Sequence, residues 1–177
     1  MVLGVGVAIT LAAWTDTEVA TGSFQAGGNF GIEATKNGAD WLDYSTTETA
    51  LALSFGDSAI ALKPSEPVYA KYGIRLKNNS AYYADIEGAV TNNSGALIAG
   101  LEVEYKELTS WSGDCSATTT DGFSEEIPDI DLVSAKETRF ICIKITPQTS
   151  IAASQQGTLT WTFTATSTGD RTIPQGG

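Results

Sequence analysis

The sequence has no histidine among its 177 residues, and this absence removes several chemistries at once. Histidine is the commonest general base and zinc ligand, and it activates the serine or cysteine nucleophile of many hydrolases. A zinc protease built on a His-Glu-x-x-His helix is therefore excluded. We predict that the protein is not an enzyme and has no catalytic residue, no metal and no other cofactor.

Positive charge is also scarce, because 10 Lys and Arg residues stand against 21 Asp and Glu, for a net charge of −11. No basic patch is available for phosphates, so we expect no nucleic-acid partner. An apolar run without charge covers residues 1–15. About thirteen of these residues are apolar, whereas a spanning helix needs about twenty, so we expect no stable membrane span in the assembled form.

Cysteine occurs only twice, at Cys115 and Cys142. In an exported chain an even number of cysteines favours a disulfide, and the alternative is a pair of buried thiols. A bridge would close a loop of about 28 residues and contribute roughly 3 kcal/mol by chain entropy.

Alternation of apolar and polar residues recurs along the chain, as is typical of half-buried strands. The segments with this pattern are residues 51–55, 68–76, 101–105, 141–145 and 158–166. Turn-rich pieces separate them, and no stretch of twelve residues has a convincing amphipathic helical pattern. Seven to nine such strands predict one all-β domain, an antiparallel β-sandwich of jelly-roll type.

The N-terminal run permits two interpretations. An apolar stretch followed by Ala12 and Ala13 is typical of the end of a secretory signal peptide, which would be removed by cleavage. The same stretch alternates large and small residues, so as a strand it has one large apolar face, formed by Leu3, Val5, Val7, Ile9 and Leu11. Such a strand can be donated to the sheet of a neighbouring subunit.

Residues 11–27, LAAWTDTEVATGSFQAG, resemble the end of a SipW-type signal peptide and the mature start that follows it. Residues 61–67, ALKPSEP, followed by a strand over 68–76 and by Asn78-Asn79-Ser80, are similar to the proline-turn segment of the TasA/camelysin family. Residues 140–146 and 157–166 fit that family's closing strands. The sequence departs from the family at Ser65, where glycine is common, and in a cysteine-containing acidic loop over 111–131.

The resemblance implies an exported jelly-roll subunit of a biofilm-matrix fibre, a homo-polymer formed by exchange of a detachable N-terminal strand. It divides the chain into a leader remnant or donor segment (1–13), a donor strand with a glycine-rich hinge (14–30), the jelly roll (31–168) and a polar tail (169–177). Cleavage near Ala12 or Ala13 would make residues 14–24 the donor strand. Its anchors would then be Trp14, Val19, Ala20 and Phe24.

Two further features have competing interpretations. The acidic residues between Asp121 and Asp131 form either a solvated loop or a calcium site. Trp41 and Trp111 either close the ends of the sandwich or stack on sugar rings. The second alternatives would suit a monomeric secreted adhesin or carbohydrate-binding sandwich, which is the rival to the fibre subunit.

Overall fold

The computed structural model describes residues 15–17, 30–45, 50–53, 55, 62–119, 121–133, 137–152 and 155–170. Within them the chain forms eight β-strands and one 3-10 turn, η3 (Ile98–Gly100). The strands are β1 (Thr15–Thr17), β2 (Ile32–Thr35), β3 (Val68–Leu76), β4 (Tyr82–Ser94), β5 (Leu101–Leu108), β6 (Ile130–Leu132), β7 (Thr138–Pro147) and β8 (Thr158–Asp170).

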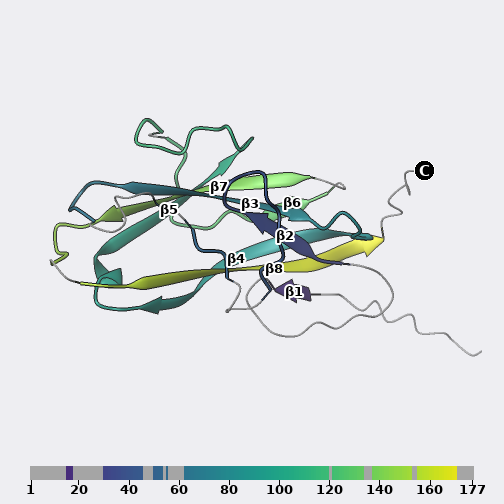
Figure 1. Cartoon of the computed structure of the whole chain (residues 1–177), viewed down its shortest axis with the longest axis horizontal. Helices are drawn as coiled ribbons and strands as arrows, with labels where there is room; N and C mark the ends of the chain where they lie inside the picture. Colours follow the sequence, from purple (N-terminus) through teal and green to yellow (C-terminus); the bar gives the residue numbers. More distant parts are fainter. Residues whose placement is uncertain are drawn as a thin grey trace, which may run out of the picture.

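The strands form two antiparallel sheets of four, so the prediction of an all-β fold is confirmed (Figure 1). Sheet A has the order β1-β8-β4-β6, and sheet B has the order β2-β3-β7-β5. Each connection from β3 to β8 passes from one sheet to the other. Strands that follow one another in sequence therefore mostly lie in different sheets and face each other across the core.

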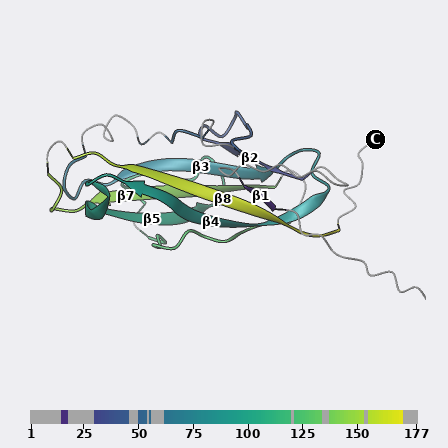
Figure 2. The same ribbon diagram turned by 90° about the horizontal axis from the view of Figure 1, so that it is seen from below.

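The two sheets share one apolar core, and their strands run along the long axis of the molecule (Figure 2). Alternate residues of the strands from β2 to β8 point into this core, as the period of a β-strand requires. They include Val68, Ile74 and Leu76 of β3, Ile141, Ile143 and Ile145 of β7, Ala84 and Ile86 of β4, and Phe163 and Ala165 of β8. The rings of Tyr72 and Phe163 stack across the sheets with centroids 4.7 Å apart.

Four of the five predicted strand segments lie within observed strands, and the segment 68–76 coincides with β3. The prediction for 51–55 is wrong, because the described residues of this segment belong to no strand. Leu51, Leu53 and Phe55 nevertheless pack against the core. The apolar side chains of this segment are partly buried, although its described backbone lies in no strand. The sequence pattern alone does not distinguish such a segment from a true strand.

The turn before β3 contains a residue in a backbone conformation that favours glycine. Ser65 has a φ of 62°, in the left-handed region that a side chain disfavours. Its backbone N–H donates to the carbonyl of Pro147 at 2.7 Å, which links the start of β3 to the end of β7. The hydrogen bond holds Ser65 in a conformation that glycine would adopt at lower cost.

A second apolar cluster covers the outer face of sheet B. Leu108, Phe140 and Cys142 are buried there beneath side chains from two loops, Trp41, Trp111, Cys115 and Phe123, together with Tyr69 of β3. The Cys115–Cys142 disulfide is present, as predicted, and it joins the acidic loop to β7. The loop of residues 111–131 therefore folds back onto sheet B.

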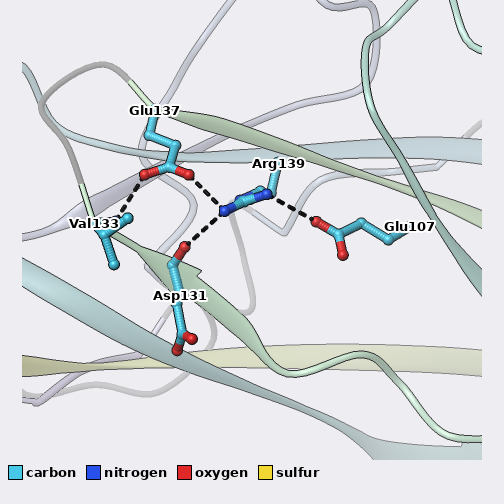
Figure 3. A network of polar contacts seen from close by, with 5 residues as sticks. All are labelled: Glu107, Asp131, Val133, Glu137 and Arg139. Carbon is cyan, nitrogen blue, oxygen red and sulfur yellow. Dashed lines mark hydrogen bonds and ion pairs between the residues drawn. The ribbon is translucent and has the colours of Figure 1, made fainter.

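Arg139 of β7 links the two sheets at one side of the sandwich, beside β6 (Figure 3). Its guanidinium lies 3.3 Å from a carboxylate oxygen of Glu107 and 2.6 Å from one of Glu137. It also donates to the backbone carbonyl of Asp131 at 3.4 Å, while Glu137 accepts from the N–H of Val133 at 2.8 Å. These contacts join β5, β6 and β7 across the gap between the sheets.

Candidate functional site

All the predicted donor residues lie outside the described residues: Leu3, Val5, Val7, Ile9, Leu11, Trp14, Val19, Ala20 and Phe24. The described part of this region is β1, which pairs with β8 of its own chain through Thr15–Thr166, Asp16–Ala165 and Thr17–Thr164. A short piece of the N-terminal segment thus already uses the edge of sheet A.

β1 covers only residues 164–166 of the 13-residue strand β8. Residues 158–163 of β8 pair with β4 on one side, and no strand of the described chain lies along the other side. The sequence of this stretch, TLTWTF, contains no charge, no proline and no glycine. Natural edge strands usually carry charges or proline, because these residues discourage pairing with another chain. We call this backbone the open edge of β8.

The outer edge of sheet B at β5 is protected in two ways. Tyr105 exchanges two backbone hydrogen bonds with Ser124, of 2.7 and 2.9 Å, so a loop occupies part of the edge. The strand also carries four charged side chains, Glu102, Glu104, Lys106 and Glu107. Charges of this kind discourage the addition of a further strand.

The edge of sheet A at β4 is protected as well. β6 covers it at Ala84, Asp85 and Ile86. Beyond β6 the strand carries the charge of Glu87, and its pairing with β8 is irregular between Val90 and Asn92. An irregular, charged edge is a poor template for strand addition. The open edge of β8 therefore differs from both of these edges.

A groove of about 340 Å³ lies beside the open edge. It is lined mainly by apolar and aromatic side chains, Leu51, Leu53, Phe55, Leu159, Trp161 and Phe163, together with Tyr44 and Tyr72. We call it the β8 groove. Sequence reasoning missed it, because it is formed by β8 and by a segment about a hundred residues earlier in the chain.

Trp161 is fixed within the groove by two neighbours. Its indole N–H donates to the Tyr105 hydroxyl at 2.8 Å, and its ring lies 6.4 Å from that of Phe55. Burial raises the pKa of the Tyr105 hydroxyl, although the Trp161 bond acts in the opposite direction. The hydroxyl therefore stays protonated at neutral pH, and the indole N–H of Trp161 has its partner within the protein. An occupant of the groove needs to offer mainly apolar surface.

Trp41 and Trp111, the two predicted candidates for sugar stacking, lie on the outer face of sheet B and not at the ends of the sandwich. Trp111 packs edge-on against Phe140, with centroids 5.8 Å apart, and its ring touches the backbone of Gly38. The guanidinium of Arg75 lies 4.4 Å from the ring centroid of Trp41. Both rings contribute to packing within the protein.

The acidic residues of the 121–131 loop do not gather into a metal site. In the part of the chain that is described, no three Asp, Glu, Cys or His side chains are placed to hold an ion. Asp131 instead lies opposite Asp85 in the ladder between β4 and β6. Desolvation, the facing carboxylate of Asp131 and the charge of Glu87 raise the pKa of Asp85.

No protein-family model matches the chain, and no curated protein matches it. Within the described ranges, no helix is both long enough and apolar enough to cross a membrane.

Proposed function

We propose that the protein is a structural subunit of an extracellular, biofilm-matrix fibre and that it polymerises by donor-strand complementation. One observation carries this proposal: an unprotected sheet edge lies beside an apolar groove, in a chain that has an apolar N-terminal strand pattern. An edge of this kind is a template for a strand from another molecule. In this proposal the protein is not an enzyme, and its activity is self-association.

The donor segment has the chemistry that the groove requires. Leu3, Val5, Val7, Ile9 and Leu11 alternate with small residues, so a strand of residues 3–11 offers one continuous apolar face. Full burial of a Val, Leu or Ile side chain contributes about 1.5–3 kcal/mol. Several such anchors, with the ladder hydrogen bonds, offset an association cost of about 4–15 kcal/mol.

The strand order supports a jelly-roll topology with a detachable N-terminal strand. If β2 is treated as an addition at the edge of β3, each remaining step from β3 to β8 alternates between the two sheets. Two interleaved Greek keys produce this alternation. β1 pairs with β8 by only three rungs, so detachment of the N-terminal segment would break few hydrogen bonds.

Export from the cell is supported by the disulfide. Cys142 is fully buried and Cys115 is partly covered, and their bridge closes a long loop. Disulfides of this structural kind persist in oxidising compartments and are rare in the cytosol. The acidic composition suits a protein that stays dispersed outside the cell until its specific edge is used.

The rival function is a monomeric secreted adhesin or carbohydrate-binding module. The β8 groove favours it in one respect, because aromatic side chains line a volume at the lower end of the range for ligand pockets, about 300–1,000 Å³. The fibre function requires an edge as well as a groove, and β8 provides both. Binding of a sugar to a stable monomer would instead support the module.

Electron microscopy of the purified chain over time, combined with sedimentation, tests the fibre function. We expect fibres from the wild type and none from Val7→Lys, which places a charge on the apolar face of the donor. Ala8→Lys is the matched control, because it lies on the opposite face of the same strand and should still polymerise.

A third variant, Phe24→Lys, distinguishes the two donor segments. Loss of fibres in Phe24→Lys but not in Val7→Lys would assign the donor to residues 14–24. A wild type that remains a monomer at high concentration would refute the fibre function.

A further inference from the structure

We propose that Asn37 is a site of deamidation and that the turn which holds it in the folded protein sets the rate of this reaction. Deamidation converts the asparagine carboxamide to a carboxylate and releases ammonia. Asn37 is the only asparagine in the sequence that is followed by glycine. Glycine favours the reaction, because it has no side chain to hinder the approach of its backbone nitrogen. Fibre assembly plays no part in this chemistry, so the site stands apart from the proposed function.

The reaction uses only the two residues and water. Hydroxide removes the proton from the backbone nitrogen of Gly38, which then attacks Cγ of Asn37. A bond forms between these two atoms, the Cγ–Nδ2 bond breaks, and Nδ2 takes a proton from water and leaves as ammonia. Water then opens the cyclic imide at one of its two carbonyls and gives aspartate or isoaspartate at position 37. The attack requires that the Gly38 nitrogen is free and that the carboxamide can turn toward it.

The folded turn withholds both groups. The N–H of Gly38 donates to the Thr35 hydroxyl at 3.0 Å. Oδ1 of Asn37 accepts from the backbone N–H groups of Ala39 and Asp40, both at 2.9 Å. Nδ2 of Asn37 donates to a carboxylate oxygen of Asp40 at 2.7 Å. Deamidation therefore needs local opening of the turn, and its rate is the intrinsic rate multiplied by the fraction of molecules in which the turn is open.

Thr35, the last residue of β2, is the positioning residue of this turn. It is fully buried, and its methyl group packs against Gly73 of β3, where an added Cβ would lie 2.7 Å from it. Its hydroxyl accepts from the N–H groups of Gly38 and Asn37, at 3.0 and 3.3 Å, and donates to Oδ1 of Asn37 at 3.0 Å. One fixed hydroxyl thus holds both the attacking nitrogen and the carboxamide that it attacks.

The product of the reaction would loosen the cover of sheet B. A carboxylate at position 37 cannot donate to Asp40, and two like charges would then face each other at hydrogen-bond distance. Isoaspartate also adds a methylene group to the main chain just before Gly38. An added Cβ at Gly38 would lie 2.3 Å from Cγ of Trp111, so the turn has no room to shift toward this ring. Trp111 packs on Phe140, and the disturbance therefore reaches the aromatic cluster on the outer face.

Mass spectrometry of proteolytic peptides, taken over time from protein kept in mildly alkaline buffer, measures the rate at Asn37. A synthetic peptide of residues 34–41 gives the intrinsic rate. We expect the peptide to deamidate about tenfold or more faster than the folded wild type, because the folded turn is mostly closed. Both rates should rise with pH, since hydroxide generates the nucleophile. A peptide that does not deamidate would overturn the site, and equal rates would overturn the role of the turn.

Three variants test Thr35. Thr35→Val removes the hydroxyl and keeps the shape, whereas Thr35→Ser keeps the hydroxyl. We expect Asn37 to deamidate about fivefold or more faster in Thr35→Val than in wild type, and within about twofold of wild type in Thr35→Ser. Tyr105→Phe controls for a general loss of stability, because it removes the hydrogen bond to Trp161 and leaves the turn intact. No acceleration in Thr35→Val, or an equal acceleration in Tyr105→Phe, would overturn the positioning role.

An exchange of two side chains tests the effect of the product and does not depend on the folding of Thr35→Val. Asn37→Asp places two carboxylates together, whereas Asn37→Asp/Asp40→Asn restores one carboxamide and one carboxylate in reversed places. We expect Asn37→Asp to unfold at a lower urea concentration than wild type and to lose near-ultraviolet circular dichroism from the aromatic cluster. The double variant should regain most of both signals, because the coupling between the two positions is then restored. A double variant no better than Asn37→Asp would overturn the effect assigned to the new charge.

Discussion

Removal of the disulfide gives the most quantitative test of how the outer face of sheet B is held. Cys115 and Cys142 are separated by 27 residues, for which the chain-entropy relation gives about 3.5 kcal/mol. For a protein of this size each kcal/mol corresponds to about 2–4 °C, so the melting temperature should fall by about 7–14 °C. The double variant Cys115→Ala/Cys142→Ala should show this loss.

The assay is urea unfolding of three samples: wild type, wild type with a reducing agent, and the double variant. The reduced wild type and the double variant should lose similar stability. The reducing agent should not change the double variant, which serves as the internal control. Near-ultraviolet circular dichroism should report altered packing around Trp111, because its loop is released from β7.

A loss below about 1 kcal/mol would refute this reasoning. It would mean that aromatic packing alone holds the loop against sheet B, with Trp111 edge-on to Phe140 and Phe123 beside Tyr69. Residual clustering of the same aromatic side chains in the unfolded chain would then already restrict the freedom that the disulfide removes.

Three further substitutions test separate parts of the fold. Ser65→Gly should raise stability by about 0.5–1 kcal/mol in urea unfolding, because relief of the left-handed conformation exceeds the entropy cost of glycine; a loss would contradict this. Tyr105→Phe should lower it by about 1–3 kcal/mol, since the indole N–H of Trp161 loses its 2.8 Å acceptor; a change within 0.5 kcal/mol, on the order of experimental error, would contradict this. Asp85 has a pKa raised above 3.8 in the folded state, so its protonation favours folding. As the pH falls from neutral through that raised pKa, wild type should gain stability relative to Asp85→Asn, and the difference should level off below 3.8; the opposite slope in unfolding curves measured across pH would refute it.

Strand positions could be predicted where burial follows a simple alternation. The segments 68–76 and 158–166 alternate cleanly, because one face of each strand meets the core and the other does not. The Asn-rich stretch at the end of β4 has the composition of a turn, yet the strand continues to Ser94 because β8 supplies ladder partners there. Pairing with a remote strand overrode local turn propensity there.

The candidate site could be predicted only in part. The donor pattern is local and visible in residues 3–11, but the acceptor is not, because it depends on which rungs of β8 remain uncovered by β1 and β4. The stretch 158–163 looks the same in sequence whether it is a central or an edge strand. Its position at the edge is decided by the short length of β1.

The sequence by itself determined the all-β class, the exclusion of histidine chemistry, the candidate cysteine pair and the apolar face of residues 3–11. Each of these depends on residue type or on spacing along the chain. The tertiary structure decided which edges are covered, where the groove lies and that the 111–131 loop covers sheet B. These properties depend on contacts between residues far apart in sequence, and the alternation pattern of a strand does not specify its neighbours.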